Sequence, residues 1–252
     1  MDKQENKLRL EPLRSEVAGP VKIFAKRLKA DITGELQSLT LVGSSLTDDF
    51  NAGKSDINTV LVVNKQSPNV LRKLAAMGKL MGAKRISTPI LMTPEYIEQS
   101  LDVFGIEFLD FQLIHHTVLG PDPFESLSFD KNNVRLQCER ELKATLIRMR
   151  QGYISSVNRK KLILEILVSV TRSLSPYLRA MLWLKGEKRP KNLEAVSAKS
   201  SQVFSIETDA LTKSRRWWYS KEKSSTEDIT NTFWKMYETV DLLAKIVDAL
   251  EV

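Results

Sequence analysis

The stretch that most constrains this chain spans residues 38–63, where apolar, β-branched runs at both ends flank a loop rich in Gly, Asp, Asn and Ser. Such a pattern predicts a strand, a loop and a second strand. Gly43 and Ser44 end the first strand, and a glycine there lets the backbone approach a bound group closely. Asp56 and Asn58 stand two apart at the start of the second strand, so their side chains are expected on one face of the sheet.

This stretch resembles the signature of the nucleotidyltransferase superfamily, which includes polymerase β and the aminoglycoside nucleotidyltransferases. That signature is an apolar residue followed by Gly-Ser, a spacer, and then acid–apolar–acid. Gly43-Ser44 and Asp56-Ile57-Asn58 carry the match, and Asn58 departs from it because an amide stands where the family has its second acid. The resemblance implies an α/β (α+β) fold, in which a mixed sheet is followed by a C-terminal helical bundle.

The resemblance also implies an activity and roles for its residues. The reaction would be Mg²⁺-dependent transfer of a nucleoside monophosphate from an NTP to a hydroxyl acceptor, whose identity the sequence leaves open. Gly43 and Ser44 would bind the nucleotide, while Asp56 and Asn58 would hold the metal. Glu107, which lies between apolar neighbours in an expected later strand, would be the third metal ligand or general base, so Asp56 and Glu107 are the catalytic candidates.

Asn58 leaves two functions open. Its amide oxygen can bind Mg²⁺ but adds no formal charge, so metal affinity should fall. The chain is then either an active nucleotidyltransferase or a catalytically degenerate relative that binds a nucleotide or a partner protein. Because of Asn58, the sequence leaves open whether the chain is an enzyme. Asp48 and Asp49 in the intervening loop are interpreted as solvated.

A change of character divides the sequence near Gly120-Pro121-Asp122-Pro123, which breaks both helical and strand periodicity. We therefore predict an α/β domain over residues 1–122 and a helical bundle over residues 123–252. The elements expected in the first part are helices near 20–35, 67–82 and 93–105 and, besides the strands already described, strands near 88–92 and 106–111.

The second part shows helical stripes, of which the last, from residue 226 onward, is the longest. This apolar helix is a candidate for pairing with a second copy, which would make a homodimer. Residues 213–219, KSRRWWY, interleave cations with aromatic rings, a pattern that stacks bases and pairs phosphates. The alternative is a corner whose tryptophans pack on the bundle, so nucleic acid stays open as a partner.

Composition adds weaker constraints. The net charge of +7 suits an anionic ligand, or equally a solvated basic surface. Cys138 is the only cysteine and falls on an apolar helical stripe, which predicts a core position. No segment is apolar over the ~20 residues needed to cross a bilayer, and the first residues lack a signal-peptide core. We therefore expect a cytoplasmic protein that does not bind membranes.

Overall fold

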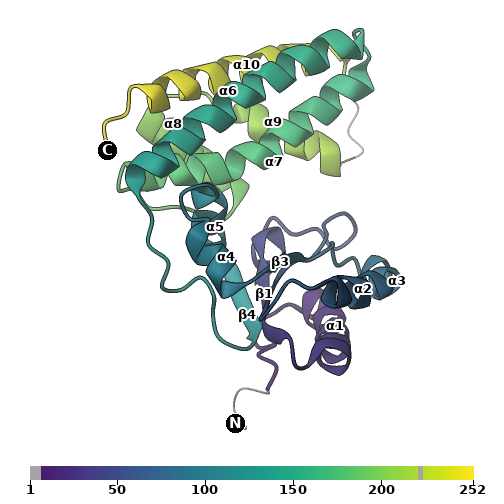
Figure 1. Cartoon of the computed structure of the whole chain (residues 1–252). Helices are drawn as coiled ribbons and strands as arrows, with labels where there is room; N and C mark the ends of the chain where they lie inside the picture. Colours follow the sequence, from purple (N-terminus) through teal and green to yellow (C-terminus); the bar gives the residue numbers. More distant parts are fainter. Residues whose placement is uncertain (1–6, 221–223) are drawn as a thin grey trace. The chain divides into compact units, whose positions relative to one another are not determined.

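The computed structural model describes residues 7–220 and 224–252. The chain divides into two compact units, of which the first comprises Met1–Leu101 and Phe111–Ser128. The second comprises Asp102–Asp110 and Phe129–Val252. Figure 1 shows the first unit in purple to teal and the second in teal to yellow. The chain thus enters the second unit, returns to the first, and then completes the second.

The first unit is built on a four-stranded sheet in the order β3-β2-β1-β4. The strands are β1 (Leu36–Val42), β2 (Asn58–Val63), β3 (Ile90–Met92) and β4 (His115–Leu119). β1 pairs antiparallel with both β2 and β4, whereas β2 and β3 are parallel. The mixed sheet expected from the sequence is therefore confirmed, and the strand–loop–strand of residues 38–63 forms its centre.

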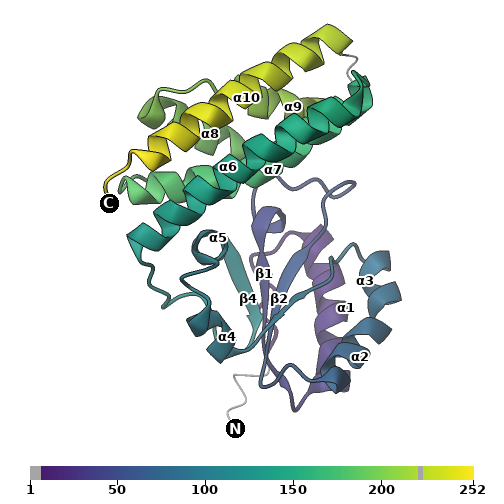
Figure 2. The same ribbon diagram turned by 45° about the horizontal axis from the view of Figure 1, so that its top comes forward.

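Four helices of this unit are α1 (Ser15–Ile32), α2 (Pro68–Ala76), α3 (Gly78–Ala83) and α4 (Pro94–Gln99). α1 and α2 pack on one face of the sheet, where Leu39 and Leu41 of β1 join Phe24 and Val70 in one buried cluster. Figure 2 shows α1, α2 and α3 together on that side. The expected helix at 67–82 is divided at Met77 into α2 and α3.

The strand predicted at residues 106–111 is wrong, because this segment lies in helix α5 (Gly105–Leu113). Ile106 and Leu109 recur at helical spacing and enter the apolar core of the second unit. The side chain of Gln137 accepts a hydrogen bond from the Ile106 N–H at 3.2 Å and donates one to the Asp102 carbonyl at 2.5 Å. A residue distant in sequence therefore caps the start of α5, which local preference does not reveal.

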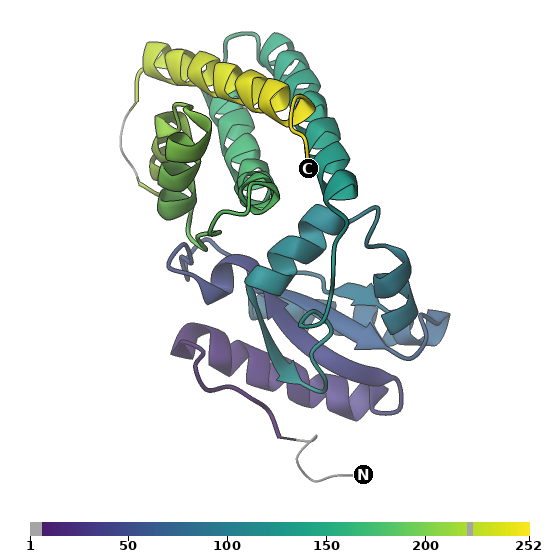
Figure 3. The same ribbon diagram turned by 90° about the vertical axis from the view of Figure 1, so that its left-hand side faces the viewer.

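The rest of the second unit is a helical bundle, as expected. Its helices are α6 (Lys131–Ser156), α7 (Lys160–Leu184), α8 (Leu193–Phe204), α9 (Asp209–Tyr219) and α10 (Thr226–Asp248). α6 and α10 lie side by side (Figure 3). Ser225 and Asp228 form a capping box at the start of α10. Across the described part of the chain, every helix is too short or too polar to cross a lipid bilayer.

Candidate functional site

The turn after β1 is built on Gly43. Its φ of +76° lies in the left-handed region that glycine adopts without strain, and it opens a short 3₁₀ turn, Gly43–Leu46. The Gly43 N–H donates to the Ile114 carbonyl at 3.2 Å, so this N–H is already engaged. The next residue, Ser44, is half-buried, and its hydroxyl has no hydrogen-bond partner among the described residues. Of the two, Ser44 has the group free to bind a phosphate.

Asn58 lies directly beside this turn. It pairs with Val42 in the β1–β2 register, and a Cβ added at Gly43 would lie 3.6 Å from the Asn58 Nδ2. The Asn58 Oδ1, the atom that would face a metal, accepts a hydrogen bond from the Ser87 hydroxyl at 2.8 Å. The sequence-predicted neighbours Gly43 and Asn58 are therefore brought together, and Ser87 is an additional residue of the site.

Asp56 is held by an arginine that sequence reasoning did not identify. Its side chain is 60% exposed, and its Oδ1 lies 3.6 Å from a terminal nitrogen of Arg85. The same guanidinium donates to the Gly53 carbonyl in the loop between β1 and β2. On the other side of this loop, Arg14 donates to the Thr47 carbonyl at 3.0 Å. Two cations thus border the loop, and each lies beside one of its acids, Arg14 at 4.0 Å from Asp48 and Arg85 at 3.6 Å from Asp56.

Glu107 lies on α5 in the second unit, where its charged neighbours are acids and an arginine of α6. Although Glu107 is exposed at the helix surface, loss of solvent around its carboxyl is the main reason that the pKa of Glu107 is raised. The hydrogen bond to its own backbone opposes the rise, and the nearby charge of Glu141 adds to it. Glu141 itself accepts a hydrogen bond from the Tyr177 hydroxyl at 3.3 Å.

The residues of the first unit do not fit a resident metal ion. A two-metal centre requires several carboxylates on one small volume. Among the residues that the structure describes, no three His, Cys, Asp or Glu side chains gather closely enough to hold one. Asp56 is paired with Arg85, and the Asn58 oxygen accepts from Ser87.

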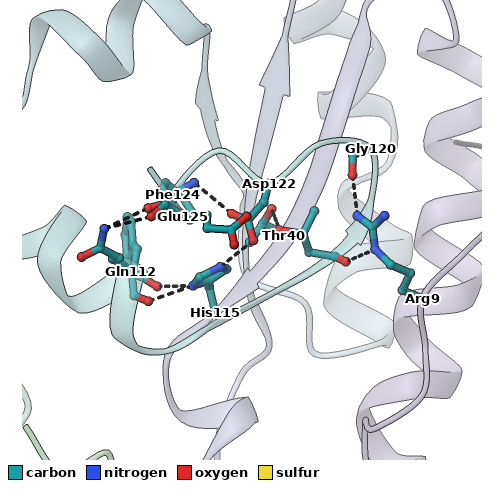
Figure 4. Close-up of polar contacts among 10 residues, drawn as sticks. Arg9, Thr40, Gln112, His115, Gly120, Asp122, Phe124 and Glu125 are labelled. Carbon is teal, nitrogen blue, oxygen red and sulfur yellow. Dashed lines mark hydrogen bonds and ion pairs between the residues drawn. The ribbon is translucent and has the colours of Figure 1, made fainter. Parts of the chain in front are cut away.

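A second polar cluster of the first unit surrounds Asp122 (Figure 4). One carboxylate oxygen lies 2.8 Å from the His115 Nε2, and the other accepts from the Phe124 N–H at 2.9 Å. The His115 Nδ1 lies 2.8 Å from the Phe111 carbonyl. Both ring nitrogens therefore lie within hydrogen-bond distance of an oxygen atom. Although burial alone would raise it, the pKa of Asp122 is lowered because the Phe124 N–H and His115 outweigh that effect.

Comparison with known proteins identifies the fold. No protein-family model matches the sequence. No curated protein sequence matches it either. Among solved structures, the spectinomycin adenyltransferase of Enterococcus faecialis, determined with ATP and spectinomycin, aligns with a TM-score of 0.56 at 10% identity. The alignment covers 88% of this chain and 98% of that one. The chain therefore has a nucleotidyltransferase-like fold.

Proposed function

We propose that this chain binds a nucleoside triphosphate at the Gly43–Ser44 turn and does so without a resident metal ion. The observation that carries the proposal is the pairing of Asp56 with Arg85 at 3.6 Å, next to an Asn58 whose oxygen accepts from Ser87. The chain is then a catalytically degenerate relative of the nucleotidyltransferases. ATP is the ligand to test first, because the adenyltransferase with the same fold was solved with it.

The electrostatic reason is the sign of the local charge. In an active site of this family, metal ions offset the repulsion between clustered carboxylates and the triphosphate. Here Asn58 is neutral, and Arg85 balances the charge of Asp56. One added negative charge at contact distance would cost on the order of a few kcal/mol at an effective dielectric of ~20. The present residues avoid that cost, so a triphosphate can approach Ser44 without a metal.

A second candidate function is slow Mg²⁺-dependent nucleotidyl transfer to an unidentified hydroxyl acceptor. The glycine turn with its positive φ and the available Ser44 hydroxyl favour it, because both belong to the signature of the active enzymes. In that function Asp56 is a metal ligand and is indispensable. In metal-free binding, Asp56 only neutralises Arg85. The two candidates therefore assign opposite effects to the loss of Asp56.

The test is a calorimetric titration of the full chain with ATP, once in EDTA and once in excess Mg²⁺. We expect the same Kd within about twofold in both buffers, since no protein charge requires the metal. Asp56→Ala should leave metal-free binding unchanged or tighter, whereas Arg85→Gln should weaken it about tenfold. Asn58→Asp should weaken binding in EDTA and regain it with Mg²⁺.

The matched control is Asp31→Ala, which removes an acid paired to Arg27 on α1, 2.7 Å away. It should not alter the affinity for ATP in either buffer. Loss of binding in Asp56→Ala, together with strict Mg²⁺ dependence of the wild type, would contradict the proposal and favour the transferase. Pyrophosphate release from ATP by the wild type would do the same.

A further inference from the structure

The cation–aromatic run of residues 213–219 lies at the C-terminal end of α9, in the second unit. Trp217 points inward and belongs to the buried core of the bundle. Trp218 stays at the surface with 36% of its side chain exposed, and Tyr219 is half-buried. The packing expected for the tryptophans is thus observed for Trp217, while Trp218 is exposed and Tyr219 is half-buried at the surface of the bundle.

Three arginines alternate with these two rings. The Arg172 guanidinium of α7 lies over the Trp218 ring at 5.6 Å, and that of Arg215 lies over the Tyr219 ring at 5.7 Å. Helical geometry places Trp218, Arg215, Tyr219 and then Arg216 in angular order around α9. We call the set Arg172, Trp218, Arg215, Tyr219 and Arg216 the arginine–aromatic strip.

Acids before and at the start of α9 and in the first turn of α10 interact with lysines. Glu207 and Asp209, at the other end of α9, are both ion-paired with Lys235. The pKa of Asp228 is lowered by hydrogen bonds from Ser225 and, more weakly, by Lys213 and Lys160. No carboxylate of the described residues forms an ion pair with Arg172 or Arg216. The positive charge of these two arginines is therefore uncompensated within the described structure.

We propose that the arginine–aromatic strip binds single-stranded nucleic acid. Guanidinium groups pair with phosphates and also stack on bases, and exposed aromatic rings stack on bases of any sequence. Arginines and aromatic rings alternate in angular order around α9, as phosphates and bases alternate along a nucleic-acid strand. The cation–π contacts hold Arg172 over Trp218 and Arg215 over Tyr219, so these two arginines lose less conformational entropy on binding.

Two features favour a single strand over other polyanions. A duplex hides its base faces, so the rings of Trp218 and Tyr219 would gain nothing from it. An acidic peptide would use the arginines but offers no flat partner for the rings. The proposal is independent of ATP binding in the first unit, because all five residues of the strip belong to the second unit.

The experiment is fluorescence anisotropy of a 5′-labelled oligouridylate with the full chain over a series of salt concentrations. With three arginines on phosphates, the slope of log K against log salt should be about −2. Replacing Arg172, Arg215 and Arg216 together by Gln should weaken binding at least about tenfold and flatten that slope. Trp218→Leu should weaken it about tenfold and leave the slope unchanged.

A control with the same loss of charge replaces Arg140, Lys143 and Lys245 of α6 and α10 by Gln, and it should bind like the wild type. Melting curves establish whether each variant is folded. If the triple variant of the strip does not fold, the single variant Arg216→Gln, at an exposed residue, replaces it in the binding experiment. Equal losses in both triple variants would overturn the proposal. So would equal or tighter binding of a blunt duplex, or binding of phosphatidylserine vesicles with the same dependence on the strip.

Discussion

Gly120, which follows β4, shows how sharply a single residue can be constrained. Its φ is +77°, and a Cβ there would lie 1.9 Å from the Gln37 carbonyl oxygen of the backbone beside it. We predict that Gly120→Ala destabilises the protein by more than about 2 kcal/mol, because backbone must move and the conformation is strained.

The control is Gly19→Ala in α1, where a Cβ meets nothing within 4 Å. Helix propensity predicts a gain there of up to about 1 kcal/mol. Denaturant unfolding of both variants gives the two free energies. A neutral Gly120→Ala would contradict the close approach of Gly120 to Gln37.

Asp122 allows a test of how the stability of the protein depends on pH. Because its folded pKa is lowered, the carboxylate contributes stability above its unfolded value near ~3.9, and this contribution is lost as the pH falls through the folded pKa. Asp122→Asn should therefore be less stable than the wild type by about 1–3 kcal/mol at mildly acidic pH. The difference should close as the pH falls through the lowered folded pKa of Asp122. A difference independent of pH would exclude the ionised bond to His115.

The site residues show what sequence alone could and could not provide. Gly43 and Asn58 were expected in one site from the resemblance to the nucleotidyltransferase signature, and the register of β1 and β2 places them side by side. Ser87 and Arg85 were missed, because only tertiary contacts bring them to Asn58 and Asp56. The available signal for Ser87 in the sequence was a hydroxyl residue just before the strand predicted near residues 88–92. The sequence gives no comparable signal for Arg85.

The ion pair between α5 and α7 is the clearest contact between elements. Asp110 and Arg179 form two parallel hydrogen bonds of 2.5 and 3.1 Å, and only 6% of Arg179 is exposed. Arg179→Met should destabilise the protein by about 3–5 kcal/mol, because it removes both hydrogen bonds to a carboxylate that has little solvent around it.

The double variant Arg179→Met, Asp110→Leu should recover much of that loss, since two apolar groups replace the pair. Thermal unfolding of the single and double variants measures the coupling. If the single and double variants were equally unstable, the loss would come from packing of the arginine stem and not from the unpaired acid.

Elements were predictable where their pattern was local. The strands around residues 38–63 and the long final helix follow from period two and period 3.6, and both are observed. α5 was predicted as a strand because residues 106–111 are rich in aromatic and branched side chains. Its helical form depends on Gln137, which caps it, and on Arg179, which pairs with Asp110. Neither partner is visible in the local sequence.

At the scale of the whole molecule, the sequence predicts a single division after residue 122, whereas the contacts assign Asp102–Asp110 to the second unit as well. We predict that a fragment of residues 129–252 melts at a lower temperature than one of residues 102–252. The shorter fragment lacks the buried Ile106 and Leu109, and it leaves Arg179 without Asp110.

Arg179→Met should partly rescue the shorter fragment, because it removes the unpaired charge. Circular dichroism melts of both fragments, with and without this substitution, give the comparison. Equal melting temperatures for the two unsubstituted fragments would instead support the single division after residue 122.

The crossing of the chain between units also has a consequence for synthesis and inheritance. On the ribosome, Ile106 and Leu109 emerge before the helices that bury them are translated, while β1 awaits β4 as its edge partner. The nascent chain therefore carries exposed apolar residues until the bundle is complete, a period in which chaperones would be needed. Neither unit is a continuous stretch of the gene, so recombination at one point cannot separate the two units without leaving part of one attached to the other.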